Sequence, residues 1–303
     1  MLQNIEIEEF NETNNNLDNI VPISKCKFTE IFEPKKGYDI WIVVNQAGAI
    51  KKLFEALKCL IYVEVKFTPS GIVIINSDKM ESMRVVTKLH AYNFEEYRVA
   101  KEVTININVY EFYRNIESAQ SGTLMTIYMY ENNDGMLKNI FLGIKIEDPI
   151  TQHVAENQFR VDPVYSTSTE TYDYLNRELY YNKIFTINSD FLYKKLKNIK
   201  KTSNIVNIEM SNRVLHFRCV TGNSRGIQTI SESKNNMSII RDDNPSKIVS
   251  NDYGIDNLVR MSKVATMSKK CKNYMDNDLP WVIEYDVSKI GSLQIFIECV
   301  NPK

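Results

Sequence analysis

The residues of this chain that most clearly indicate a binding function are lysines at helical spacing. The segment AIKKLFEALK, residues 49–58, carries three lysines and one glutamate on its polar side. Its apolar residues recur at i, i+3, i+4 and i+7, which predicts an amphipathic helix: Ile50, Leu53, Phe54 and Leu57. A lysine ammonium is a mobile point charge that can neutralise an anion without fixed geometry. The segment therefore predicts a helix whose exposed side attracts an anionic partner.

Positive charge is concentrated on the predicted helices. The 303-residue chain has 37 Lys and Arg, 38 Asp and Glu and a net charge of −1. Four predicted helices, at 49–58, 109–119, 189–201 and 255–270, hold 13 basic and 5 acidic residues, which leaves −9 for the rest. One lysine-rich helix is explained by solubility alone. If all four share one face, that face attracts a polyanion and the remaining surface repels it.

Enzymatic and metal chemistry find little support. The three histidines, His90, His153 and His216, lie far apart, and neither G-x-x-x-x-G-K-[ST] nor G-x-G-x-x-G occurs. The five cysteines form no C-x-x-C pair, which indicates ordinary thiols in a reducing compartment. We predict no catalytic residue, no metal site and no cofactor.

The second half of the chain repeats the first at a constant offset. Adding 143 to the residue number carries Asn45, Lys51 and Lys52 onto Asn188, Lys194 and Lys195. It also carries the predicted hairpin VEVKF–IVIIN onto VNIEM–LHFRC without a gap. An internal repeat of this length predicts two similarly built domains.

The repeat divides the chain into four parts. Residues 1–36, rich in Asn and acidic residues, are predicted to be an N-terminal extension that is flexible or only partly ordered. The first domain spans 37–161, a polar, tyrosine-rich linker that we expect to be exposed spans 162–182, and the second domain spans 183–303. No apolar run is long enough for a membrane span, and the N-terminus lacks the layout of a signal peptide. We expect an intracellular protein.

Four segments carry a resemblance to a known family: AIKKLFEALK, SGIVIINSD, FEEYRV and the C-terminal run KVATMSKKCKNYMDNDLPWVIEYDVSKIGSLQIFIECVNPK. In their order and spacing, across roughly residues 38–303, they resemble the proliferating cell nuclear antigen (PCNA) family of DNA sliding clamps. The resemblance implies an α+β fold of two similar clamp domains, each with curved antiparallel sheets and two helices on the concave face. The prominence of Asn, Ile, Lys and Tyr suggests a large DNA virus as the source, which implies action in the nucleus or in a cytoplasmic viral replication factory.

The resemblance also implies a homotrimeric ring, closed head to tail. The strand near 151–161 of one chain would pair with the strand near 225–233 of the next. The implied contact residues are His153, Ala155, Gln158, Ile227, Thr229 and Ser231. Such a ring would encircle double-stranded DNA without reading its sequence and would keep a polymerase on its template.

The positions that would contact DNA are basic residues of the helices. The resemblance implies Lys51, Lys52, Lys58, Lys194, Lys197 and Lys263, and further candidates are Arg114, Lys195, Lys200, Lys201 and Arg260. The second helix departs from the family pattern. It places Phe112 and two glutamates where the family is more basic.

A second implied surface is a groove beneath the interdomain linker. There the family binds short peptide motifs of DNA polymerase and other replication and repair proteins. The matching positions are Ser77, Met83, Leu175, Leu179, Pro280, Phe296 and Pro302. A clamp loader is a further implied partner.

Three alternatives stay open at this stage. One is a monomeric or dimeric processivity factor that holds DNA by charge, against which the −9 remainder argues. Another is one subunit of a heterotrimeric checkpoint-type clamp. A third, from a different class, is a nuclease or transferase on an unfamiliar fold.

Overall fold

A computed structural model describes most of the chain. The described residues are 40–77, 82–134, 137–164, 179–221, 224–233, 236–260, 262–277 and 279–300. The predicted extension at 1–36 and most of the predicted linker lie outside these ranges.

The first half of the described chain has two helices among nine strands. In chain order its elements are β1 (Ile40–Val44), α1 (Ala47–Leu57), β2 (Tyr62–Thr68), β3 (Gly71–Ser77), β4 (Met83–His90), the 3-10 turn η3 (Ala91–Asn93), β5 (Glu96–Val99), β6 (Val103–Asn108), α2 (Val109–Asn115), β7 (Leu124–Asp134), β8 (Leu137–Glu147) and β9 (Val154–Pro163).

The second half follows the same order. Its elements are β10 (Lys183–Asn188), α4 (Ser189–Lys200), β11 (Ile205–Ser211), β12 (Val214–Thr221), β13 (Ser224–Ser231), β14 (Met237–Asp242), β15 (Val249–Gly254), α5 (Ile255–Arg260), the 3-10 turn η4 (Ser262–Thr266), β16 (Lys270–Met275), β17 (Trp281–Val287) and β18 (Gly291–Ile297).

The structure confirms the repeat. The shift that relates Lys51 to Lys194 also carries β2 (Tyr62–Thr68) onto β11 (Ile205–Ser211), and the start of β3 onto the start of β12. The strand pairings repeat too: β1 lies between β5 and β7, as β10 lies between β14 and β16. The two halves are therefore one structural unit used twice.

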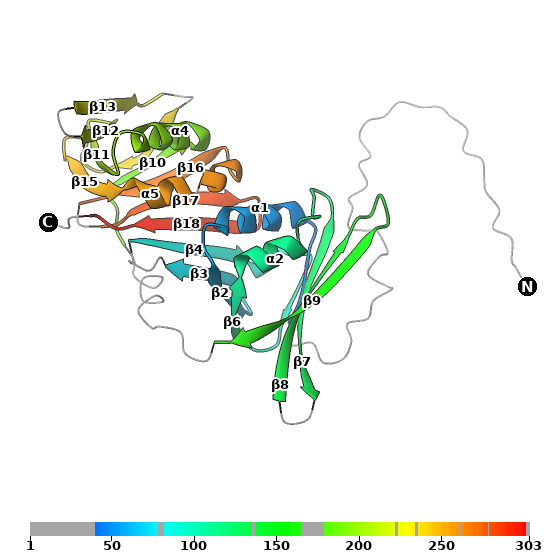
Figure 1. The fold of residues 1–303 in the computed structure, drawn as a ribbon. Coiled ribbons are helices and arrows are strands. Elements are labelled where there is room, and N and C mark those ends of the chain that lie inside the picture. Colours follow the sequence, from blue (N-terminus) through cyan, green and yellow to red (C-terminus); the bar gives the residue numbers. More distant parts are fainter. Residues whose placement is uncertain are drawn as a thin grey trace, which may run out of the picture. The chain divides into compact units, whose positions relative to one another are not determined.

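One antiparallel pairing joins the two halves (Figure 1). Strand β18 pairs with β4 in a register that runs from Gly291 opposite Leu89 to Ile297 opposite Met83. The result is a 14-stranded sheet in the order β14-β10-β16-β17-β18-β4-β3-β2-β6-β9-β8-β7-β1-β5. A separate four-stranded sheet has the order β13-β12-β11-β15.

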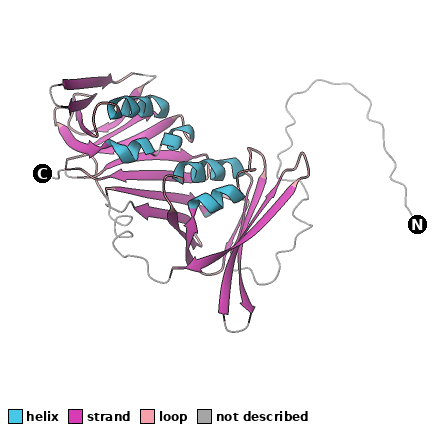
Figure 2. Cartoon of the chain, viewed as in Figure 1, coloured by secondary structure: helices cyan, strands magenta, loops and turns pink. Residues whose placement is uncertain are grey.

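The helices lie together on one face of the strands (Figure 2). Helices α1, α2 and α4 each bury apolar side chains against the sheets, and in the first half the rings of Phe54 (α1) and Phe112 (α2) stack with centroids 4.0 Å apart. Burial of such side chains contributes roughly 1.5–3 kcal/mol each. This packing explains why the polar sides of all the helices face outward in common.

Two sequence predictions need correction. A single helix over 255–270 is wrong, because α5 ends at Arg260, η4 ends at Thr266 and Lys270 begins β16. Pairing of β16 with β10 overrides helix propensity there. The linker is not uniformly exposed, because Tyr181 is buried.

A buried ion pair stabilises the start of the second half. The ammonium of Lys183 (β10) contacts the carboxylate of Asp242 (β14) and donates a hydrogen bond to the carbonyl of Asn244 at 2.5 Å. Both side chains are almost fully buried. Removing one partner leaves an unpaired buried charge, which costs more than the pair contributes.

We expect Lys183→Met to lower the free energy of unfolding, measured by urea titration, by about 3–5 kcal/mol. The double variant Lys183→Met/Asp242→Leu should recover most of this loss. The matched control is Lys200→Ala, which breaks a partly exposed pair with Asp256 and should cost under about 1 kcal/mol. Equal losses in Lys183→Met and Lys200→Ala would contradict this account.

Candidate nucleic-acid interface

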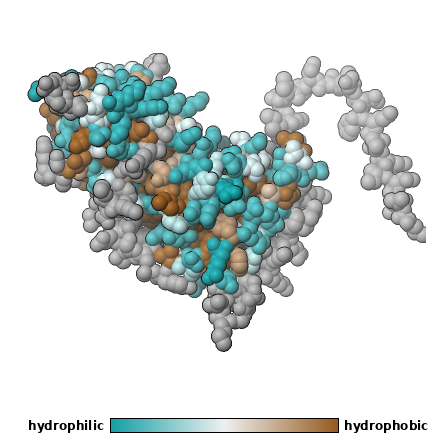
Figure 3. Space-filling model, in the orientation of Figure 1, coloured by the Kyte–Doolittle hydropathy of each residue, from teal (hydrophilic) through white to brown (hydrophobic). Residues whose placement is uncertain are grey.

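Capped helices hold the basic side chains on one face. The N-cap of α4 is Asn188, whose Oδ1 accepts the backbone N–H of Phe191 at 2.9 Å. The N-cap of α2 is Asn108, which accepts from the N–H groups of Tyr110 and Glu111. Such caps contribute about 1 kcal/mol each and fix where the helix begins. The surface over α4 is largely hydrophilic (Figure 3).

Several of the predicted cations are held by neighbours within the chain. Lys51 donates to the carbonyl of Glu117 at 2.5 Å, and Lys263 pairs with Glu55 at 3.1 Å. Lys200 pairs with Asp256. The ammonium of Lys58 lies 3.4 Å from the ring centroid of Tyr113, a cation–π contact. These four lysines are anchored, so they present charge from fixed positions.

Other predicted cations have no such anchor. Lys52, Lys194 and Arg114 are exposed and make no ion pair or side-chain hydrogen bond with the part of the chain that the structure describes. Within the described ranges, Lys195 and Lys197 make ring contacts alone, with Phe191 and Tyr193. Free lysines are the best suited to transient phosphate contacts. Arg260 is the last residue of α5.

The side chains near α2 differ in sign from those on α4. Residues 189–201 have five lysines and one aspartate, whereas residues 109–117 have one arginine and two glutamates. Burial raises the pKa of Tyr113, the carboxylates of Glu55 and Glu117 raise it further, and Lys263 lowers it. Acidic groups thus gather beside α2 on a face that is otherwise basic.

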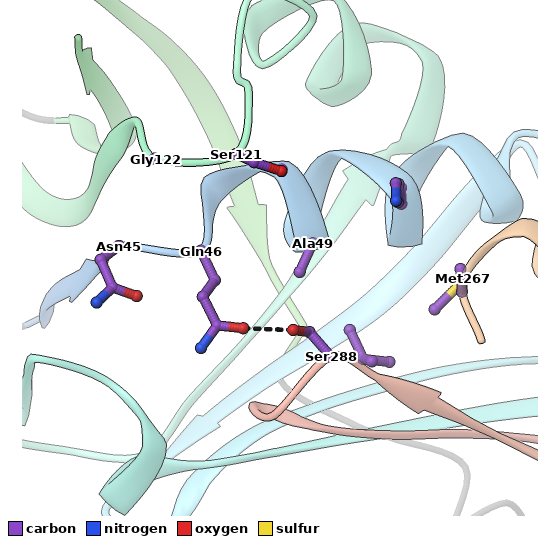
Figure 4. Close-up of a pocket in the computed structure, with 10 residues that line it drawn as sticks. Asn45, Gln46, Ala49, Ser121, Gly122, Met267 and Ser288 are labelled. Atoms are coloured by element: carbon purple, nitrogen blue, oxygen red, sulfur yellow. Dashed lines mark hydrogen bonds between the residues drawn. The ribbon is translucent and has the colours of Figure 1, made fainter. Parts of the chain in front are cut away.

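A small cavity lies where the two halves meet on this face (Figure 4). Its volume is about 210 Å³, and its lining includes Gln46, Lys52 and Met267. The hydroxyl of Ser288, in the β17–β18 turn, donates a hydrogen bond to the side-chain oxygen of Gln46 just before α1. The junction thus brings the β17–β18 turn to the beginning of a helix of the other half.

Strands β9 and β13 each have an open edge in the part of the chain that the structure describes. Residues 154–161 of β9 pair with β8 on one side and have no partner strand on the other within the described ranges. Strand β13 likewise pairs only with β12 there. The predicted contact residues lie on these two strands or beside them: His153 lies in the turn before β9, Ala155 and Gln158 on β9, and Ile227, Thr229 and Ser231 on β13. Open edges are sites for pairing with another chain.

Comparison with known proteins identifies the family. The model of the proliferating cell nuclear antigen N-terminal domain matches residues 41–160, and that of the C-terminal domain matches residues 177–300. The chain belongs to the PCNA family. The α+β clamp fold expected from the sequence is confirmed. Family members are non-enzymatic scaffold proteins, and the expectation that this chain is not an enzyme is likewise confirmed.

Two relatives align over most of their length. A protein of Paramecium bursaria Chlorella virus 1, named probable DNA polymerase sliding clamp 1, is 21% identical over 257 residues, which are 83% of this chain and 93% of the relative. The proliferating cell nuclear antigen of Chaetomium thermophilum is 22% identical over 263 residues, which are 84% and 95%. The viral origin of the first relative agrees with the viral source expected from the composition of the sequence.

The predicted groove positions do not all come together in this PCNA-family chain. Phe296 and Leu179 belong to a small apolar cluster apart from the main core, with Val86, Tyr181, Ile184, Val282, Tyr274 and Leu279. Met83 lies in the main core instead, Pro280 is buried and Ser77 is exposed. Leu175 and Pro302 lie outside the described residues. The sequence prediction missed Tyr181, whose hydroxyl donates to the carbonyl of Pro280 at 3.1 Å.

The sequence also predicts that the chain has no metal site and no membrane span. Among the described residues, no group of His, Cys, Asp or Glu could hold a metal ion. Over the same ranges, none of the helices is long and apolar enough to span a bilayer.

If the helical face binds duplex DNA, its free lysines should set the salt dependence. We expect Lys52→Ala/Lys194→Ala to weaken DNA binding and to flatten the plot of log affinity against log salt by about 0.9 for each phosphate that is no longer neutralised. Fluorescence anisotropy with a DNA duplex, from 50 to 300 mM salt, measures this slope.

The matched control is Lys88→Ala/Lys101→Ala, which removes two lysines from β4 and the β5–β6 turn, outside the helices. It should leave the slope unchanged. Equal slopes in both double variants would count against the helical face as the DNA-binding surface.

Proposed function

We propose that this chain is a DNA sliding clamp: three copies close into a ring around duplex DNA and tether a polymerase to its template. The observation that carries the proposal is the internal junction. Strands β4 and β18 pair within the chain, while their counterparts in the repeat, β13 and β9, are open. The same junction can form between chains, and a head-to-tail contact that closes produces a ring.

The repeat also defines which residues would meet. The row of paired residues Ile187, Cys271, Tyr285 and Leu293 corresponds to the row Val44, Met125, Ile146 and Ala155. In the other half of the junction, Val65, Ile74 and Thr87 correspond to Ile208, Phe217 and Gln228. Because Leu293 lies opposite Thr87, we expect Ala155 to lie opposite Gln228 of the next chain.

Exposed apolar side chains support the same contact. Ile227 on β13 is 66% exposed and Val154 on β9 is 53% exposed. Their counterparts at the internal junction are Val86, which is buried there, and Ser292. Pairing of the two edges would cover Ile227 and satisfy the open backbone groups of both strands.

A ring of this kind places the helical face around the DNA. Lysines contact phosphates regardless of base sequence, so the ring holds the duplex without reading it and can slide. No bond is made or broken. The partners we propose are duplex DNA, a DNA polymerase and other replication and repair proteins, a clamp loader, and two further copies of the chain, at the sites of DNA replication in the nucleus or a viral factory.

The apolar cluster around Phe296 is the proposed docking place for partner peptides. Leu179 and Leu279 are only partly buried there, so an apolar anchor of a peptide can add to the cluster. Recognition of a short motif by such a surface is a common mode of protein binding.

Solution mass tests the ring. Light scattering over a concentration series should give a mass near three times the 35.2 kDa chain. Ala155→Arg places a charge where the internal junction buries Leu293, so it should convert the trimer into smaller species. The matched control is Ile240→Arg on β14, an exposed edge strand outside the proposed contact. A monomer or dimer at every concentration in the unmodified chain would contradict the homotrimer.

A further inference from the structure

We infer that Glu117, just after α2, forms a salt bridge with Lys195 of α4 in the next protomer. The inference rests on the ring proposed above and adds a second contact to the edge-strand pairing. It gives a role to the acidic residues that stand on an otherwise basic face.

The internal junction shows how helices meet when β18 and β4 pair. There η4 lies beside α1, and Lys263 of η4 pairs with Glu55 of α1 at 3.1 Å. Lys52, one turn before Glu55 on α1, lines the junction cavity together with Met267, which follows η4. Thus Lys52 and Glu55 mark the side of α1 that faces the other half.

The repeat transfers each of these positions to the contact between chains. Strands β1 and β2, which flank α1, map onto β10 and β11 with the one shift that relates Lys51 to Lys194. That shift carries Lys52 onto Lys195 and Glu55 onto Asn198. The side of α4 that would face the next protomer therefore holds Lys195 and Asn198.

The α2 segment transfers in the same way. Asn108 lies opposite Tyr62, and Gly254 lies opposite Ile205, so the strand before α2 maps onto the strand before α5 with the shift that carries Asn108 onto Gly254. The strand after α2 maps with this second shift as well, because Met125 corresponds to Cys271. The second shift carries Glu117 onto Lys263.

The charges are complementary, with the signs exchanged. At the internal junction the base is on η4 and the acid on α1. Between chains the acid, Glu117, is beside α2, and the base, Lys195, is on α4 one turn from Asn198. Neither Glu117 nor Lys195 has a side-chain ion-pair partner among the described residues of the single chain. Each charge is therefore available to the other.

Neighbouring residues distinguish this contact from general charge. Lys194 corresponds to Lys51. The ammonium of Lys51 donates to the carbonyl of Glu117, so Lys51 extends toward α2 of its own half. Lys194 therefore faces its own chain's α5–η4 side, although it is adjacent to Lys195. Glu111 lies within α2, six residues before Glu117, which follows the helix.

Charge reversal with rescue tests the salt bridge. We expect Glu117→Lys and Lys195→Glu each to raise the concentration at which the trimer dissociates by roughly tenfold at 50 mM salt, because like charges then face each other. At 500 mM salt the effect should shrink, since exposed charges are screened. The double variant Glu117→Lys/Lys195→Glu should restore assembly. Sedimentation equilibrium measures all three.

Matched controls are Glu111→Lys and Lys194→Glu, which change the net charge equally and should leave the dissociation concentration within about twofold. Equal effects in the controls, or no rescue in the double variant, would overturn the salt bridge. If the unmodified chain forms a trimer that Ala155→Arg disrupts while Glu117→Lys does not, this inference fails and the ring stands. If the unmodified chain never forms a trimer, both fail.

Discussion

The antiparallel pairing of β18 with β4 is the constraint on which the rest of this structure depends. It joins two copies of one unit into a continuous sheet and brings all the helices to a common face. Because each unit offers one strand to this pairing, the other two equivalent strands, β9 and β13, are left open at their outer edges within the described chain. The junction between β18 and β4 is therefore complete within the chain, whereas β9 and β13 each offer one strand of a second such junction.

The charge distribution follows from the same arrangement. Helices packed by their apolar sides onto one face of the sheets must present their polar sides together, and in this chain those sides are mostly lysine. Some lysines are anchored by Glu55, Asp256 or Tyr113, whereas Lys52 and Lys194 are free of such contacts among the described residues. Fixed lysines shape the field of the face, and free ones can exchange between phosphates. The proposed contact of Glu117 with Lys195 assigns part of the basic charge to assembly, so ionic strength would act on the ring as well as on DNA binding.

Much of the architecture could be predicted from the sequence because the unit occurs twice. The periodic spacing in α1 and the hairpins after α1 and α4 were visible in the sequence, and so was the shift between them. Strands β5, β14 and β16 are among the strands that the sequence did not reveal, for physical reasons. Strands β5 and β14 are edge strands with weak burial patterns. Strand β16 buries the polar Asn273, which accepts a hydrogen bond from the indole of Trp281. Because Asn273 occupies a buried position, the sequence of β16 lacks the regular alternation of apolar and polar residues that predicts a strand.

The candidate site was predictable to a similar extent. Which residues are basic and lie on helices follows from the sequence, but which of them are anchored depends on contacts between distant segments, such as Lys263 with Glu55. The apolar cluster around Phe296 includes Tyr181, which stands in a polar segment without periodicity and gave no signal of its burial.

Cross-linking at the predicted register tests the central claim most directly. Ala155→Cys/Gln228→Cys should form disulfides between chains under mild oxidation, because directly opposed residues of paired strands lie close enough for an S–S bond. The largest product should contain three linked chains. Each single-cysteine variant is the control for links that native thiols form. An out-of-register pair, Ala155→Cys/Ser231→Cys, should remain unlinked. Ladders beyond three chains would contradict the closed trimeric ring. Efficient linkage only in the out-of-register pair would contradict the repeat of the internal junction.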